Sequence, residues 1–268
     1  MSLIKFVSRA FGKHRSSSCS LKMAMFHIGR CGSTVVANML SQHHNLFWAN
    51  ELYEPIFKQW DRLNPDFTQP GAMPVSPLEY LQRSLIKANG KTYGFEIKPY
   101  HFRLIGFPVE KYLEEIESMN FGHFILLDRK NKLRKIISSL KAKKTGVYHL
   151  KNGSKAKLEK IYIPIDNIQI DHESKSLLKY INDYCQDIEL IKNLLKTKNH
   201  ISLTYEEDIE NNPLVAYSKI CQFIEFKKIE PIISLVKTTP FPIRDLIENF
   251  EEVANCLENT PYKWMLED

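Results

Sequence analysis

Leu21-Lys-Met-Ala-Met-Phe-His-Ile28, followed by Gly29-Arg-Cys-Gly-Ser-Thr34, is the stretch of sequence that decides the fold. The first part is mostly apolar and predicts a buried β-strand that Gly29 ends. Apolar residues between Val35 and Leu40 then recur at helical spacing. At such a strand-to-helix junction, free backbone N–H groups and the positive helix end favour a bound phosphate or sulfate. The alternative is that the glycines and hydroxyls only cap the helix.

Strand and helix signals alternate along the rest of the chain, which indicates a parallel sheet covered on both faces. The expected strands are Tyr93–Ile97, Phe121–Leu127 and His200–Thr204, and the expected helices are Leu133–Leu140, Ser174–Lys196, Pro213–Phe226 and Arg244–Leu257. Residues 145–171 form a long insertion without a clear pattern. We therefore expect one α/β domain over residues 21–268, a P-loop-like parallel sheet flanked by helices.

Composition excludes several other classes of protein. A chain of 268 residues with 43% hydrophobic content can bury a sizeable core, which argues against disorder. Its five cysteines are widely spread and form no CxxC pair, so neither a disulfide scaffold nor a zinc site is expected. No carboxylate or histidine cluster has metal-ligand spacing, so no metal is expected.

Positive charge is concentrated in one segment. The chain carries a net charge of +6, but residues 129–160 hold twelve Lys or Arg and a single acid, Glu159. This segment therefore carries +11 and the rest of the chain −5. The imbalance predicts an anionic partner.

The first 20 residues form a basic, loosely amphipathic segment. They lack the apolar run of a secretory signal, and no stretch of about 20 apolar residues would cross a membrane. We therefore expect a soluble, cytoplasmic protein. Residues 1–15 would either lie on an anionic membrane surface or pack as a helix on the core.

Four segments in order along the chain resemble the sulfotransferases that use 3′-phosphoadenosine 5′-phosphosulfate (PAPS), in particular bacterial and carbohydrate members. Residues 30–34, Arg-Cys-Gly-Ser-Thr, are similar to the family's phosphate loop, except that Cys31 replaces the usual serine. Residues 47–55 resemble its acidic Tyr-Glu-Pro segment, and residues 124–138 its strand, basic turn and serine-bearing helix. Residues 203–208 resemble its Tyr-Glu-Asp strand, whose acids we expect to cap a helix or pair with a basic loop.

The resemblance implies a donor site for PAPS and an acceptor that is a hydroxyl-bearing small molecule, sugar or glycolipid. Arg30 would stabilise charge on the leaving phosphate. The family's spacing puts Lys130 eight residues before Ser138 and Arg129 nine before it, so either side chain is a candidate for the 3′-phosphate. The implied donor-binding residues are Arg30, Cys31, Gly32, Ser33, Thr34, Arg129, Lys130 and Ser138.

The acceptor hydroxyl needs a general base, and three residues compete for this role. Glu51 lies 21 residues after Arg30, where the resemblance places the family's catalytic glutamate. Glu54 is the glutamate of the Tyr-Glu-Pro sequence, but it aligns with the family's catalytic glutamate only after a three-residue shift. His101 follows the strand that ends at Ile97. Lys98, at the end of that strand, would either contact the donor's sulfate or be solvated.

Two other functions fit part of the sequence. A P-loop nucleotide kinase or NTPase would use the same junction, but a Walker A motif needs a lysine between Gly32 and Ser33. A nucleic-acid-binding protein would use the basic segment, which offers only Tyr148 as an interleaved aromatic residue, so no nucleic-acid partner is expected. Residues 57–91 and 145–171 are expected to shape the acceptor pocket.

Overall fold

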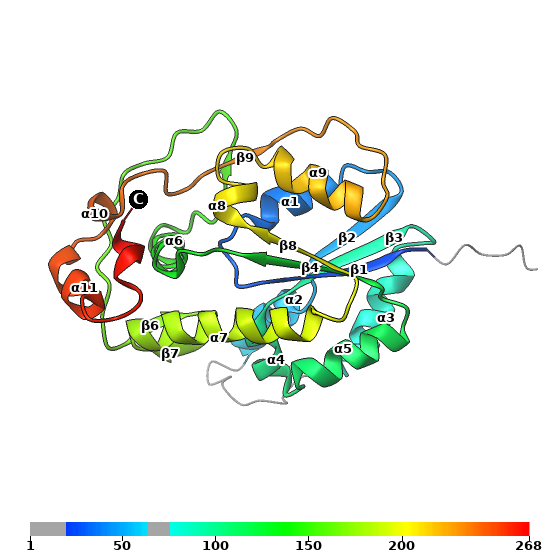
Figure 1. Ribbon diagram of the computed structural model, residues 1–268, viewed down its shortest axis with the longest axis horizontal. Helices are drawn as coiled ribbons and strands as arrows, with labels where there is room; N and C mark the ends of the chain where they lie inside the picture. Colours follow the sequence, from blue (N-terminus) through cyan, green and yellow to red (C-terminus); the bar gives the residue numbers. More distant parts are fainter. Residues whose placement is uncertain (1–19, 64–75, 268) are drawn as a thin grey trace, which may run out of the picture.

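A five-stranded parallel sheet forms the centre of the molecule (Figure 1). The structure is a computed structural model that describes residues 20–63 and 76–267, with only the backbone described at 60–63. The basic segment expected at the amino terminus therefore lies almost wholly outside the described residues. The sheet order is β2(Leu46–Glu51), β3(Thr92–Ile97), β1(Lys22–His27), β4(His123–Asp128) and β8(His200–Thr204). All four pairings are parallel, so the expected single α/β domain is confirmed.

Helices cover both faces of the sheet (Figure 1). Along β1, Met23 and Met25 pack in one cluster with Val36 and Ile220, whereas Ala24 and Phe26 pack in the other with Phe124. Alternate side chains of a strand point to opposite faces, and both faces of β1 are covered, which explains why the run from Met23 to Phe26 is apolar. The first face carries α1(Ser33–Leu40), α8(Tyr205–Asp208) and α9(Leu214–Phe223); the second carries α2(Glu54–Leu63), α3(Pro77–Lys87), α4(Pro99–Ile105), α5(Val109–Ser118) and α7(Leu177–Leu195).

The end of α6(Lys132–Thr145) and the last helices of the chain lie toward the carboxyl ends of the strands (Figure 1). The helix α6 leads into β5(Leu150–Lys151), which pairs antiparallel with β9(Leu235–Val236). A short hairpin follows, formed by β6(Ile168–Ile170) and β7(Glu173–Lys175). The chain ends with α10(Ile243–Leu246), α11(Phe250–Leu257) and the 3₁₀ helix η1(Lys263–Leu266).

Three details differ from the sequence-based expectation. Strand β2, which was not predicted, joins the sheet edge beside β3. The helix predicted over Arg244–Leu257 is two helices, because Ile247 is extended and bridges to Ile161. The helix predicted from Ser174 starts at Leu177, since residues 173–175 belong to β7.

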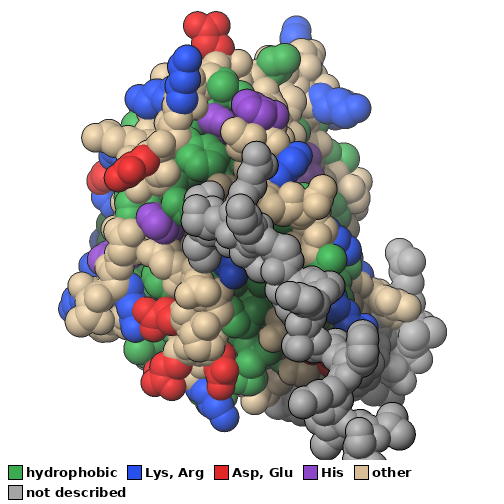
Figure 2. Space-filling model, turned by 90° about the vertical axis from the view of Figure 1, so that its right-hand side faces the viewer, with side chains coloured by type: hydrophobic (Ala, Val, Ile, Leu, Met, Phe, Trp, Pro, Cys, Tyr) green, Lys and Arg blue, Asp and Glu red, His purple; other side chains and the backbone are tan. Residues whose placement is uncertain are grey.

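The two ends of the sheet differ in charge pattern. On the side that carries the amino ends of the strands, basic and acidic side chains are interspersed over the visible surface (Figure 2). At the carboxyl ends, basic side chains from several elements approach the loop between β1 and α1. In the described part of the chain, no helix combines the length and apolarity needed to cross a bilayer.

Candidate active site

The loop from Gly29 to Gly32 joins β1 to α1 through an unusual backbone path. Gly29, Arg30 and Gly32 have positive φ values of 77°, 54° and 83°. A Cβ atom on Gly32 would lie 2.7 Å from Ile209 Cγ2, so only glycine fits there. Gly32 is also the residue before α1, and no side chain caps this helix.

This path leaves backbone donors without partners. The N–H groups of residues 30–34 donate to no acceptor in the described part of the chain, whereas those of Val35 and Val36 bond to the Gly32 carbonyl. Free amides at a helix N-terminus are the elements of an anion site. The structure thus favours an anion-binding loop over one that only caps the helix.

Two arginines add positive charge to the loop. Arg30 Nε donates to Ser138 Oγ at 2.9 Å, and its other nitrogens donate to Tyr148 O and to Thr238 Oγ1. Arg129 is only 4% exposed and donates through Nη1 to Arg30 O at 2.8 Å. Neither guanidinium forms an ion pair within the residues that the structure describes. Burial lowers the pKa of both groups, and for Arg30 the neighbouring Arg129 lowers it further.

One donor of Arg129 is orphaned. Its Nε is buried and has no hydrogen-bond partner among the residues that the structure describes, while the guanidinium lies 4.3 Å from the centre of the Tyr205 ring. A buried cationic donor without an acceptor is costly unless a ligand satisfies it. An anion bound at this position would give the Arg129 Nε an acceptor.

Lys130 points elsewhere. It is exposed and its Nζ pairs with Glu207, while the backbone N–H groups of Lys130 and Asn131 donate to Glu206. The prediction that the acids of residues 205–208 pair with a basic loop is confirmed. Of the two cations that the sequence left open, the structure brings Arg129 to the phosphate loop and leaves Lys130 on the surface.

Carboxylates gather at the neighbouring strand ends, around Lys98. Glu51 ends β2, and its Oε2 lies 2.7 Å from Lys98 Nζ; Glu54 Oε2 lies 3.7 Å from the same atom. Lys98 also borders the phosphate loop, because a Cβ on Gly29 would be 3.6 Å from its Cε. Burial disfavours the charge on Lys98, but Glu51 and Glu54 outweigh it and raise the pKa above its ordinary value.

The three candidate bases have different surroundings. Glu54 is bound by Tyr100 Oη at 2.5 Å, by His101 Nε2 at 3.4 Å and by both Lys58 and Lys98. Although burial opposes it, these partners hold the pKa of Glu54 far below its ordinary value. Such a firmly held carboxylate is a poor proton acceptor.

His101 is also committed to the fold. Its side chain is fully buried, and Nδ1 accepts the N–H of Lys98 at 3.2 Å, so Nε2 carries the proton that faces Glu54. Glu51, by contrast, is 28% exposed and has Lys98 as its partner within the described residues. Of the three candidate bases, only Glu51 has a carboxylate oxygen that is free to accept the proton of an incoming hydroxyl.

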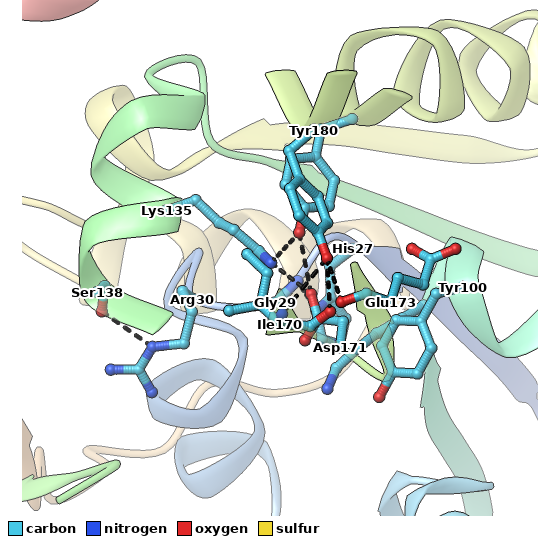
Figure 3. A network of polar contacts seen from close by, with 12 residues as sticks. His27, Gly29, Arg30, Tyr100, Lys135, Ser138, Ile170, Asp171, Glu173 and Tyr180 are labelled. Carbon is cyan, nitrogen blue, oxygen red and sulfur yellow. Dashed lines mark hydrogen bonds and ion pairs between the residues drawn. The ribbon is translucent and has the colours of Figure 1, made fainter. Parts of the chain in front are cut away.

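Sequence reasoning missed a second polar group that lies over the phosphate loop (Figure 3). Asp171, at the tip of the β6–β7 hairpin, binds the buried Nζ of Lys135 and lies 3.1 Å from Tyr184 Oη. Lys135 Nζ lies 2.5 Å from Tyr184 Oη. Asp171 gave no sequence signal because it belongs to the patternless insertion.

One group of described residues has the donor set for a metal ion. The ligating atoms of His27, Glu51 and Glu96 all lie within 4.8 Å of one another. His27 Nδ1 accepts the N–H of Gly29 at 3.0 Å, and Nε2 lies 3.0 Å from Glu96 Oε2. Glu96 also accepts from Trp48 Nε1 at 2.8 Å. These contacts hold the backbone of Gly29, the first residue of the phosphate loop, in place.

Comparisons with known proteins give similarity of fold. No protein-family model and no curated protein sequence matches the chain. Among solved structures, the chain is similar to a tunicamycin resistance protein from Deinococcus radiodurans, with 12% identity, a TM-score of 0.44 and coverage of 79% of this chain and 99% of that one. It is also similar to a sulfotransferase from Alicyclobacillus acidocaldarius, with 12% identity, a TM-score of 0.48 and coverage of 92% and 94%. We therefore base the functional proposal on this chain's own residues.

Proposed function

We propose that this protein transfers the sulfuryl group of PAPS to a hydroxyl acceptor, a sugar or a glycolipid. The observation that carries the proposal is the half-buried Arg30 and the buried Arg129, whose guanidinium groups lie at the phosphate loop and form no ion pair with a described residue. A dianionic ligand would supply the missing counter-charge and an acceptor for Arg129 Nε.

Two anion-binding elements match the two charged ends of PAPS. The amides of residues 30–34 and the start of α1 would hold the 5′-phosphosulfate. Arg129 and Ser138 would hold the 3′-phosphate, because both contact Arg30. Both elements lie at the carboxyl ends of the adjacent strands β1 and β4, where ligands of α/β sheets bind.

Transfer then requires little covalent chemistry from the protein. As in phosphoryl transfer, the main tasks are to align the acceptor oxygen with the leaving phosphate and to stabilise the charge that grows there. Arg30 is placed to stabilise the leaving phosphate. Glu51 would accept the proton of the acceptor hydroxyl, and Lys98 would hold the Glu51 carboxylate in place.

We expect the protein to bind adenosine 3′,5′-bisphosphate, the product of such a transfer, without magnesium. Isothermal titration calorimetry in EDTA should show saturable heat with this ligand, and added magnesium should change the affinity by less than about two-fold, since the arginines supply the counter-charge. Saturable heat with Mg-ATP and none with the bisphosphate would reject the proposal in favour of a nucleotide kinase or NTPase.

A further inference from the structure

The tip of the β6–β7 hairpin has an unfavourable sequence for its backbone. Ile170 pairs with Glu173, so Asp171 and His172 form the two-residue turn. Their φ values are 52° and 61°, a conformation that usually selects Asn-Gly. Side chains kept at strained positions often serve the site that they face.

The Asp171 carboxylate lies among the cations of the site. It binds Lys135, which is 0% exposed, and it interacts electrostatically with Lys98 and Arg30. Figure 3 shows Asp171 in the same polar network as Lys135. Asp171 is therefore a half-buried carboxylate, paired with Lys135, beside the cations proposed to bind the donor.

The hairpin tip is held firmly in this position. Tyr180 Oη lies 2.9 Å from Ile170 O and 2.7 Å from Glu173 O, and it accepts the N–H of Ile170. Arg103 binds both carboxylate oxygens of Glu173, at 2.9 and 3.1 Å. Since both sides of the turn are anchored, Asp171 cannot easily move away from an incoming anion.

Along the edge formed by the carboxyl ends of the strands, the charge therefore changes from positive after β1 and β4 to negative near β2. Arg129 follows β4 and Arg30 follows β1, and neither forms an ion pair with a carboxylate in the described chain. At the other end, Glu51 and Glu54 follow β2 and surround Lys98. A chain of phosphates that extended from the phosphate loop toward β2 would meet these carboxylates and Asp171.

We propose that Asp171 determines donor specificity by repelling any phosphate beyond the one held at the phosphate loop. A single sulfuryl group, with one negative charge, is accepted there, whereas the longer and more highly charged chain of a nucleoside triphosphate is rejected. Like charges placed close together in a partly buried site are a common means of rejecting a wrong ligand. This inference rests on the proposed donor site.

The test is a gain of binding in the variant Asp171→Asn. Its affinity for ATP, titrated in EDTA, should rise about ten-fold or more, because one like charge is removed from a partly buried site. Its affinity for adenosine 3′,5′-bisphosphate should change by less than about three-fold, since that ligand has no further phosphate at this position. A damaged fold would not produce such a gain.

Asp187→Asn is the matched control. Asp187 lies on α7 and binds Arg103, which also anchors the hairpin, so this change removes the same charge outside the proposed donor site. ATP affinity should not change in this variant. If Asp171→Asn does not fold, Asp171→Ser removes the same charge and should show the same gain.

The outcomes separate the two proposals. Failure of the wild-type protein to bind the bisphosphate would overturn the donor site itself. Retained bisphosphate binding, with equal ATP affinity in the wild type and in the folded Asp171 variant, would overturn only the role of Asp171.

Discussion

Glu51→Gln is expected to lower turnover by about 10²- to 10⁴-fold, with donor binding nearly unchanged. Glutamine keeps the size of the side chain and can still accept a hydrogen bond from Lys98, but it cannot take the proton of the acceptor. The measurement is the initial rate of sulfuryl transfer, together with calorimetric titration of adenosine 3′,5′-bisphosphate. A residue that only supports the fold would change binding and stability along with the rate.

Glu54→Gln and His101→Gln are the matched controls. Glu54 is bound by four polar partners and His101 is fully buried, so both changes should act through stability and local packing. Neither change should lower turnover while leaving donor binding intact, which is the result expected for Glu51→Gln. If Glu51→Gln stays active and one of the controls loses turnover with intact binding, the role of base moves to that residue.

Arg129→Met is expected to weaken bisphosphate binding by about 100-fold while leaving the folded protein as stable or slightly more stable. The change removes a charge-assisted contact to the ligand, and such contacts are worth several kcal/mol when desolvated. It also removes a buried cation whose Nε has no partner, and replacing such a charge by an apolar side chain is often neutral or stabilising. Calorimetry and thermal unfolding of the same preparation would measure both effects.

Lys130→Met is the control for this prediction. Lys130 is one position further along the same loop, but it is exposed and paired with Glu207. Surface ion pairs of this kind contribute about 0–1 kcal/mol, so both binding and stability should change little. A larger loss of binding in Lys130→Met than in Arg129→Met would contradict the assignment of the 3′-phosphate to Arg129.

The sequence was sufficient for the part of the fold that depends on local pattern. The run from Leu21 to Ile28 is apolar at most positions that the sheet buries, with His27 as a buried exception, and the glycines after it fit one backbone path, so β1, the phosphate loop and α1 could be predicted. The strand at residues 200–204 was also predicted with its observed bounds. Both features depend on residues that are close together in the sequence.

Features that depend on distant contacts were missed. Strand β2 contains Asn50 and Glu51 and joins the sheet only by pairing with β3, so its sequence did not identify it. Arg129 and Lys130 are both candidates in the sequence, and the structure distinguishes them: Arg129 is buried against Arg30 O, whereas Lys130 is exposed and pairs with Glu207. Asp171 reaches the site because Tyr180 and Arg103 anchor its hairpin. Neither of these residues belongs to a sequence motif that includes Asp171.

The most direct test of the central claim is transfer of ³⁵S-labelled sulfate from PAPS to a panel of sugars, glycolipids and phenols, measured in the presence of EDTA. We predict a labelled product with at least one hydroxyl acceptor, formed by the wild-type protein and greatly reduced in Glu51→Gln. Absence of label from every acceptor, together with transfer of the γ-phosphate from Mg-ATP under matched conditions, would contradict the account.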